Sequence, residues 1–99
     1  MKARSHDVRQ VAETVAIQAL SYLAAEPARL GRFLAETGLG PETLRGSAKS
    51  PEFLVSVLDF VLSDETLVRE FAAAHDLKPR TVGAAREALG GPSWERDAP

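Results

Sequence analysis

Apolar residues recur with helical spacing along most of the chain, and capping and turn residues divide them into separate helices. The first predicted helix begins at Asp7, which with Gln10 resembles a capping box, and it runs to about Ala25. Most later helices begin at a proline, a residue favoured in the first helical turn. They are predicted at 27–37, from 41 as a short helix, at 51–62, from 64 or 65 to about 75, and from 79 to the glycines at 90 and 91. The sequence therefore predicts an all-α fold, a compact bundle of five or six helices.

The segment 51–62 is apolar almost all round, with only Ser56 and Asp59 interrupting its valines, leucines and phenylalanines. These residue types also suit a buried strand. Twelve residues that follow a Ser50-Pro51 cap are more typical of a helix, because buried strands are shorter. A helix without a polar face is buried on all sides. We therefore expect this helix in the middle of the domain.

Shifting the sequence by 38 residues aligns it with itself. The identical pairs include Phe33 with Phe71 and Pro41 with Pro79, and conservative pairs lie between them at apolar positions. We interpret the chain as two pseudo-repeated three-helix units. The alternative is that two amphipathic helical segments align this well by chance.

Ninety-nine residues are expected to form one domain. We expect residues 1–6 to be a flexible N-terminus, residues 7–90 a single helical domain and residues 91–99 a C-terminal tail, because the tail is rich in glycine, proline and charge. Trp94 is the one large apolar residue of this tail. It either packs on the domain or serves as an exposed contact for a partner, unless it is simply disordered.

Composition excludes several classes of function. The net charge of −2 excludes a globally basic nucleic-acid binder, and the lack of cysteine excludes disulfides, zinc thiolate sites and thiol catalysis. The two histidines, His6 and His75, are far from the spacing of metal ligands on one helix. No phosphate-binding glycine loop is present, and no cluster of titratable residues indicates acid–base catalysis. We expect no enzyme, no catalytic residue, no cofactor and no metal.

A membrane or secreted location is also not expected. The longest uncharged segment, Thr14–Ala25, is too short to span a bilayer, and its apolar residues have helical spacing rather than forming a continuous run. The absence of cysteine fits a reducing compartment. We expect a cytoplasmic protein.

Residues 71–89 resemble a helix-turn-helix, in which Lys78, Arg80 and Arg86 would offer positive charge to DNA. Two observations argue against this function. The equivalent segment 33–48 has the same pattern of residues but carries Glu36 and Glu42 beside one arginine. The pattern is therefore explained more simply as a structural turn that ends one helix and begins the next. The helix and turn before the basic residues are also acidic, with Asp64, Glu65, Glu70 and Asp76.

Three stretches resemble one family of small alphaproteobacterial proteins, known only as domain of unknown function 3572. They are AIQALSYLAAEPARLGRFLAETGLGPETLR, PEFLVSVLDFVLSDETLVREFA and a closing Gly-Gly-x-x-Trp, within residues 10–95. The resemblance implies a compact cytoplasmic helical protein from a bacterium and brings no activity, ligand or catalytic residue.

By elimination, the function we predict is a non-enzymatic cytoplasmic protein-interaction module whose partner is another protein. Small helical units without catalytic residues commonly act through surface patches. The alternatives are the helix-turn-helix DNA-binding protein and a protein that binds an apolar small molecule between its helices.

Overall fold

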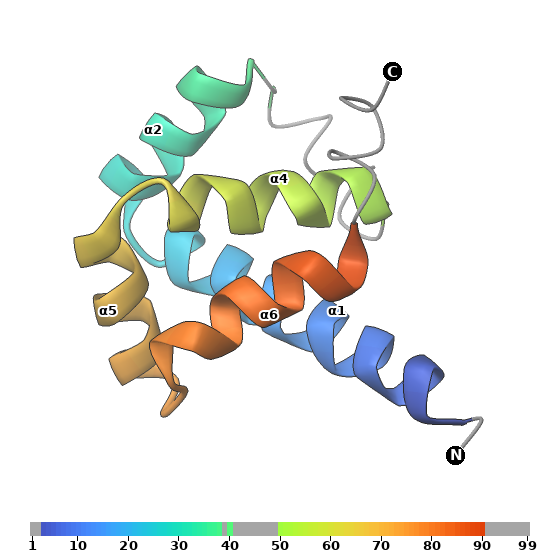
Figure 1. The fold of residues 1–99 in the computed structure, drawn as a ribbon. Coiled ribbons are helices and arrows are strands. Elements are labelled where there is room, and N and C mark those ends of the chain that lie inside the picture. The colour runs from blue at the N-terminus through green and yellow to red at the C-terminus, as the bar shows by residue number, and fades with distance from the viewer. Residues whose placement is uncertain (1–2, 39, 41–49, 91–99) are drawn as a thin grey trace.

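The computed structural model describes residues 3–38, 40 and 50–90, and these residues form five helices packed into one bundle (Figure 1). The helices are α1 (Ala3–Ala24), α2 (Pro27–Thr37), α4 (Pro51–Leu62), α5 (Glu65–Ala74) and α6 (Pro79–Leu89). No strand occurs among the described residues, and the predicted all-α fold is confirmed. The short helix expected from Pro41 and the tail 91–99 lie outside the described residues. The expected division into domain and tail therefore stays a prediction.

The expected start of the first helix at Asp7 is corrected by the structure. α1 begins at Ala3, so residues assigned to a flexible N-terminus are helical from that position. The physical reason is that Ala3 and Arg4 are strong helix formers, and Ser5 and His6, although weaker, are not helix breakers, so the helix can continue backwards past Asp7. A capping-box pattern can also occur inside a helix, and it marks a helix start only when the residues before it disfavour helix.

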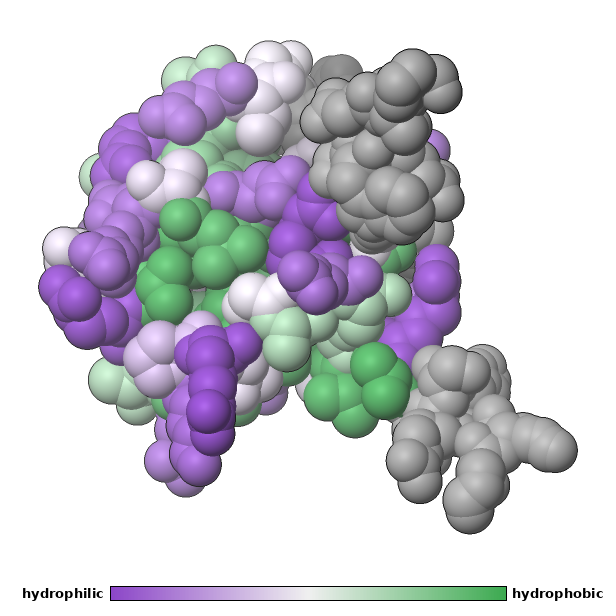
Figure 2. Space-filling model, in the orientation of Figure 1, coloured by the Kyte–Doolittle hydropathy of each residue, from purple (hydrophilic) through white to green (hydrophobic). Residues whose placement is uncertain are grey.

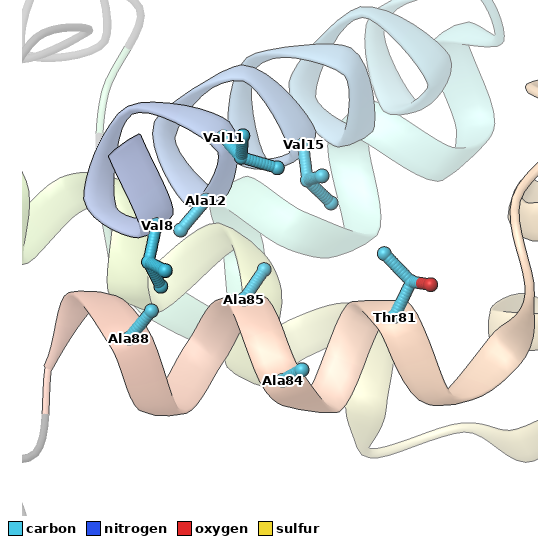
Figure 3. A pocket seen from close by; sticks show the side chains of 8 residues that line it. All are labelled: Val8, Val11, Ala12, Val15, Thr81, Ala84, Ala85 and Ala88. Carbon is cyan, nitrogen blue, oxygen red and sulfur yellow. The ribbon is translucent and has the colours of Figure 1, made fainter. Parts of the chain in front are cut away.

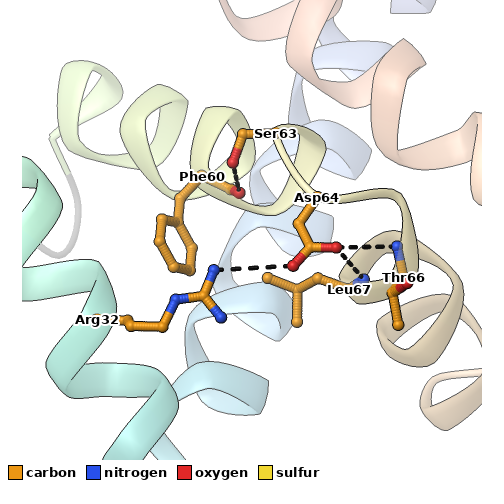
Figure 4. Close-up of polar contacts among 6 residues, drawn as sticks. All are labelled: Arg32, Phe60, Ser63, Asp64, Thr66 and Leu67. Atoms are coloured by element: carbon orange, nitrogen blue, oxygen red, sulfur yellow. Dashed lines mark hydrogen bonds and ion pairs between the residues drawn. The ribbon is translucent and has the colours of Figure 1, made fainter.

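Two of the later helices begin with a side-chain cap: Ser50, which the sequence predicts as a cap, and Asp64, which it predicts only as a helix start. The Ser50 hydroxyl accepts a hydrogen bond from the Phe53 backbone N–H at 3.4 Å. The Asp64 carboxylate accepts from the backbone N–H groups of Thr66 and Leu67 at 3.0 and 3.3 Å (Figure 4). Each cap satisfies amide groups that have no partner within their helix, which stabilises the fold by about 1 kcal/mol.

α4 lies in the middle of the bundle and packs against all four other described helices (Figure 1). Its buried apolar residues are Phe53, Leu54, Val57, Leu58, Phe60 and Val61. Burying each such side chain contributes about 1.5–3 kcal/mol, so this helix supplies much of the hydrophobic stabilisation. The prediction that the most apolar segment is the central helix is confirmed.

The repeat found in the sequence is also a repeat of backbone structure. α1 ends at Ala24 and α4 ends at Leu62, while α2 begins at Pro27 and α5 at Glu65, so both boundaries differ by the same 38 residues. The turns between them match as well. The Glu26 N–H donates to the Leu23 carbonyl at 3.2 Å, and its equivalent in the second half, the Asp64 N–H, donates to the Val61 carbonyl at 3.2 Å.

The two halves pack against each other reciprocally. The Tyr22 ring of α1 lies 5.7 Å from the Phe71 ring of α5, centre to centre. The equivalent of Tyr22 is Phe60 of α4, and it lies 5.4 Å from Phe33 of α2, the equivalent of Phe71. Each half thus places an aromatic ring of its first helix against an aromatic ring from the second helix of the other half, which is the contact pattern of a two-fold relation.

Candidate interaction surface

An apolar hollow of about 260 Å³ lies between the N-terminal half of α1 and α6 (Figure 3). We call it the α1/α6 groove. It is lined by Val8, Val11, Ala12, Val15, Thr81, Ala84, Ala85 and Ala88. Thr81 is the one lining residue with a polar side chain, so the groove suits an apolar ligand.

The groove is open because its two walls differ in side-chain size. α1 contributes valines, whereas α6 contributes mainly alanines, which are too short to fill the space between the helices (Figure 3). Val8 and Val11 consequently remain 49% and 59% exposed. In the space-filling view, apolar surface lies where the N-terminal half of α1 leaves the bundle (Figure 2). Exposed apolar side chains gathered in a concave site are typical of an interaction surface.

The groove is formed where the chain departs from its internal repeat. α4 begins at Pro51, which is equivalent to Glu13 of α1. The turns of α1 before Glu13 therefore have no counterpart in α4, and they extend beyond the rest of the bundle (Figure 1). They supply Val8, Val11 and Ala12 to the groove.

Sequence reasoning missed this groove. A signal was present, since Val8, Val11 and Val15 have the i, i+3, i+7 spacing of one helical face, and Ala84 and Ala88 are four residues apart. Each pattern is also typical of an ordinary core-facing stripe. The structure shows that the side chains of these two helix faces lie opposite each other where α1 and α6 cross and do not fill the space between the helices.

The three residues proposed to contact DNA have different environments in the structure. Lys78 and Arg80 are exposed at the start of α6. The Arg86 side chain is only 14% exposed, and its Nε–H donates to Asp59 Oδ1 of α4 at 2.6 Å. A guanidinium that already binds a carboxylate is less available to a phosphate, so the exposed basic patch consists of two residues.

The turn between α5 and α6 is a packed corner. Leu77 packs against the core, and its N–H donates to the Ala72 carbonyl at 2.7 Å. This arrangement agrees with the interpretation of the Leu-x-Pro pattern as a way to end one helix and begin the next. Trp94, the other proposed partner contact, lies outside the described residues and stays a prediction.

A model of the family described as "Protein of unknown function (DUF3572)" matches residues 9–92. The chain belongs to this family. The match covers most of the chain, including α2, α4, α5 and α6 in full, and it confirms the resemblance noted in the sequence. Comparison of this DUF3572 chain with curated proteins and with solved structures gave no match in either case.

Two arginines of α2 in this DUF3572 chain lie against aromatic rings of neighbouring helices. The Arg32 guanidinium lies 5.3 Å from the Phe60 ring centre and pairs with Asp64 at 3.7 Å (Figure 4). The Arg29 guanidinium lies 4.1 Å from the Tyr22 ring centre. Such cation–π contacts stabilise helix packing by about 0.5–1 kcal/mol at exposed sites. Both arginines therefore have a role in holding α2 to its neighbours.

His75 lies in a similar environment. Its ring is 5.1 Å from the Phe71 ring and 6.3 Å from the Tyr22 ring, centre to centre. In the part of the chain that the structure describes, no group of three or more His, Asp or Glu side chains could hold a metal ion. Among the described helices, none combines the length and apolar character needed to cross a bilayer.

Proposed function

We propose that this DUF3572 chain is a non-enzymatic protein-interaction module of the cytoplasm, and that the α1/α6 groove receives the apolar face of a helix from a partner protein. The observation that carries the proposal is the groove itself. It is lined almost entirely by carbon, and Val8 and Val11 stand half exposed along one wall. Covering each valine would contribute about 1 kcal/mol, roughly half of what complete burial of such a side chain gives.

A partner helix fits the shape of the groove better than an enclosed small molecule does. The groove runs between two helices, and the short side chains of Ala84 and Ala88 permit close approach of another backbone. Recognition of an amphipathic helix by an apolar groove is a common mode of peptide binding. The volume of about 260 Å³ lies below the roughly 300–1,000 Å³ of typical ligand pockets.

The DNA-binding alternative has less support. With Arg86 bound to Asp59, the exposed cations of the proposed patch are Lys78 and Arg80. Two phosphate contacts correspond to a salt slope of only about −1.8 on duplex DNA, which is little at physiological salt. The exposed Asp76 lies two residues before Lys78 and opposes an approaching phosphate backbone.

Site-specific photo-crosslinking in the organism that makes the protein tests the proposal. Ala84, exposed in the groove, is replaced by p-benzoylphenylalanine, and Ala35, exposed on α2, receives the same replacement as the control. We expect position 84 to crosslink to one discrete protein through a segment with helical apolar spacing, and position 35 not to. Equal labelling from both positions, or crosslinks from position 84 to nucleic acid alone, would contradict the proposal.

A further inference from the structure

The α1/α6 groove opens beside the end of α6. Val8 and Ala88 face each other at that end of the groove, close to Gly90, the last residue that the structure describes (Figure 3). Among the described residues, the large apolar side chains that remain exposed are Val8, Val11 and Ile17, and the first two line the groove. Ile17 lies about 13 Å farther along α1 than Val8. The groove is therefore the exposed apolar surface nearest to the end of α6.

The chain that follows Gly90 is long enough to bring an aromatic side chain back to this groove. Trp94, the only tryptophan of the chain, comes four residues after Gly90. Four extended residues span up to about 14 Å, whereas Ala84 lies about 9 Å before Gly90 along the helix axis. Pro92 disfavours continuation of α6, because proline has no N–H and its ring clashes with the preceding turn. Gly91 tolerates the backbone angles that a reversal of the chain requires.

The groove suits an indole ring in size and in chemistry. Its volume is about 260 Å³, whereas an apolar cavity of roughly 150 Å³ already holds a benzene ring. Ala84 and Ala88 form a wall of short side chains against which a flat ring can lie (Figure 3). Because Val8 and Val11 remain half exposed, the groove is open on one side, and an indole N–H there can keep its hydrogen bond to water.

We propose that Trp94 packs into the α1/α6 groove of its own chain, so that the C-terminal tail occupies this surface when no partner is bound. A short flexible linker gives an effective concentration in the millimolar range, so a contact too weak to form between separate molecules is populated within one. The partner helix then competes with Trp94 for the groove. This competition rests on the proposed function, whereas the contact of Trp94 with the groove does not. A groove occupied about nine-tenths of the time would bind a partner about tenfold more weakly than the same groove in Trp94→Ala.

Acrylamide quenching of the fluorescence of the intact chain tests the contact, because all tryptophan emission comes from Trp94. We expect a blue-shifted emission and a quenching constant severalfold below that of the same chain unfolded in urea. Ala84→Glu and Val11→Glu each place a charge on one wall of the groove and should make Trp94 as accessible as in the unfolded chain. Ala35→Glu, on the exposed surface of α2, should leave it protected. Circular dichroism verifies that each variant keeps its helices.

Three results would overturn the proposal: a wild-type Trp94 as accessible as in the unfolded chain, a Trp94 that stays protected in both groove variants, or protection that is lost on dilution. The last result would assign the groove to the tail of a second copy. These measurements need no partner, so they are independent of the crosslinking from position 84. A protected Trp94 without a crosslinked protein would support this inference and contradict the proposed function, and an accessible Trp94 with a discrete crosslinked protein would do the reverse.

Discussion

Gly38 and Asp76 occupy the same position in the two halves of the chain, and both have a positive φ, 76° and 58°. Glycine adopts this left-handed conformation without steric cost, and aspartate is one of the few other residues found there. The 38-residue shift pairs two chemically unrelated residues at this point, and their backbone conformations show that the two positions are structurally equivalent. The internal repeat therefore extends through both helices of each unit to the residues that follow them.

Because Gly38 has a left-handed conformation and Gly31 is helical, a glycine-to-alanine substitution should change the free energy of unfolding in opposite directions at these two positions. A Cβ added at Gly31 or at Gly38 would meet no atom within 4 Å, so neither change causes a clash. Gly31→Ala should raise the free energy of unfolding by about 0.5–1 kcal/mol, because it stiffens a helix interior. Gly38→Ala should lower it by about 1 kcal/mol, because alanine is strained at positive φ. Urea unfolding of both variants measures the difference, and effects of the same sign would contradict this explanation.

The repeat also predicts that α2 gains a side-chain cap when Glu26 is replaced by aspartate, the residue at the equivalent position before α5. Glu26 and Asp64 precede equivalent helices with nearly the same backbone angles, but only Asp64 accepts hydrogen bonds from its helix. Glu26→Asp should therefore stabilise α2 by about 0.5–1 kcal/mol, since the shorter side chain can reach the free N–H groups. Thermal unfolding of this variant beside Glu26→Ala isolates the cap. Identical midpoints for the two variants would show that no cap forms.

Phe33 and Phe71 are equivalent core positions, and both are fully buried. Each ring lies within 6 Å, centre to centre, of at least one other aromatic ring. Phe33→Ala and Phe71→Ala should each destabilise the fold by about 3–5 kcal/mol, because each leaves a cavity in the core. Urea unfolding of both variants is the measurement. A loss under about 1 kcal/mol at one of them would break the structural symmetry inferred from the repeat.

Much of the fold follows from local signals that the sequence carries. Proline at the first helical position and the Ser50 cap place most of the later helix starts, and the 38-residue period predicts the equivalence of Phe33 and Phe71. The predicted start of α1 is wrong, because a capping pattern such as that at Asp7 marks a helix start only where the preceding residues disfavour helix, and those before Asp7 include no glycine or proline. Local patterns are thus reliable where several signals agree.

The candidate site could not be predicted in the same way. The α1/α6 groove depends on how two helices far apart in the chain cross, and on the difference in size between Val8 of one and Ala84 of the other. Neither property is local. The ion pair between Asp59 and Arg86 is a similar case, because helical periodicity placed each residue on a helix face but did not bring the two faces together.

The structure also predicts that the chain does not bind DNA specifically. Lys78 and Arg80 supply too little exposed charge once Arg86 is bound to Asp59. A mobility-shift assay against genomic fragments at physiological salt should give no shift, with wild type and Arg80→Ala alike. Sub-micromolar binding to one fragment that is lost in Arg80→Ala would restore the helix-turn-helix interpretation of residues 71–89.

The central claim is that the α1/α6 groove is a docking surface, and the affinity of the protein captured from position 84 tests it most directly. Calorimetric titration compares wild type with Ala84→Glu, which puts a charge in the groove, and with Ala35→Glu, which puts one on α2. We predict at least about tenfold weaker binding for Ala84→Glu, equal to 1.4 kcal/mol, and unchanged binding for Ala35→Glu. Wild-type binding should show the negative heat-capacity change of apolar burial. Equal affinities for all three proteins would contradict the account.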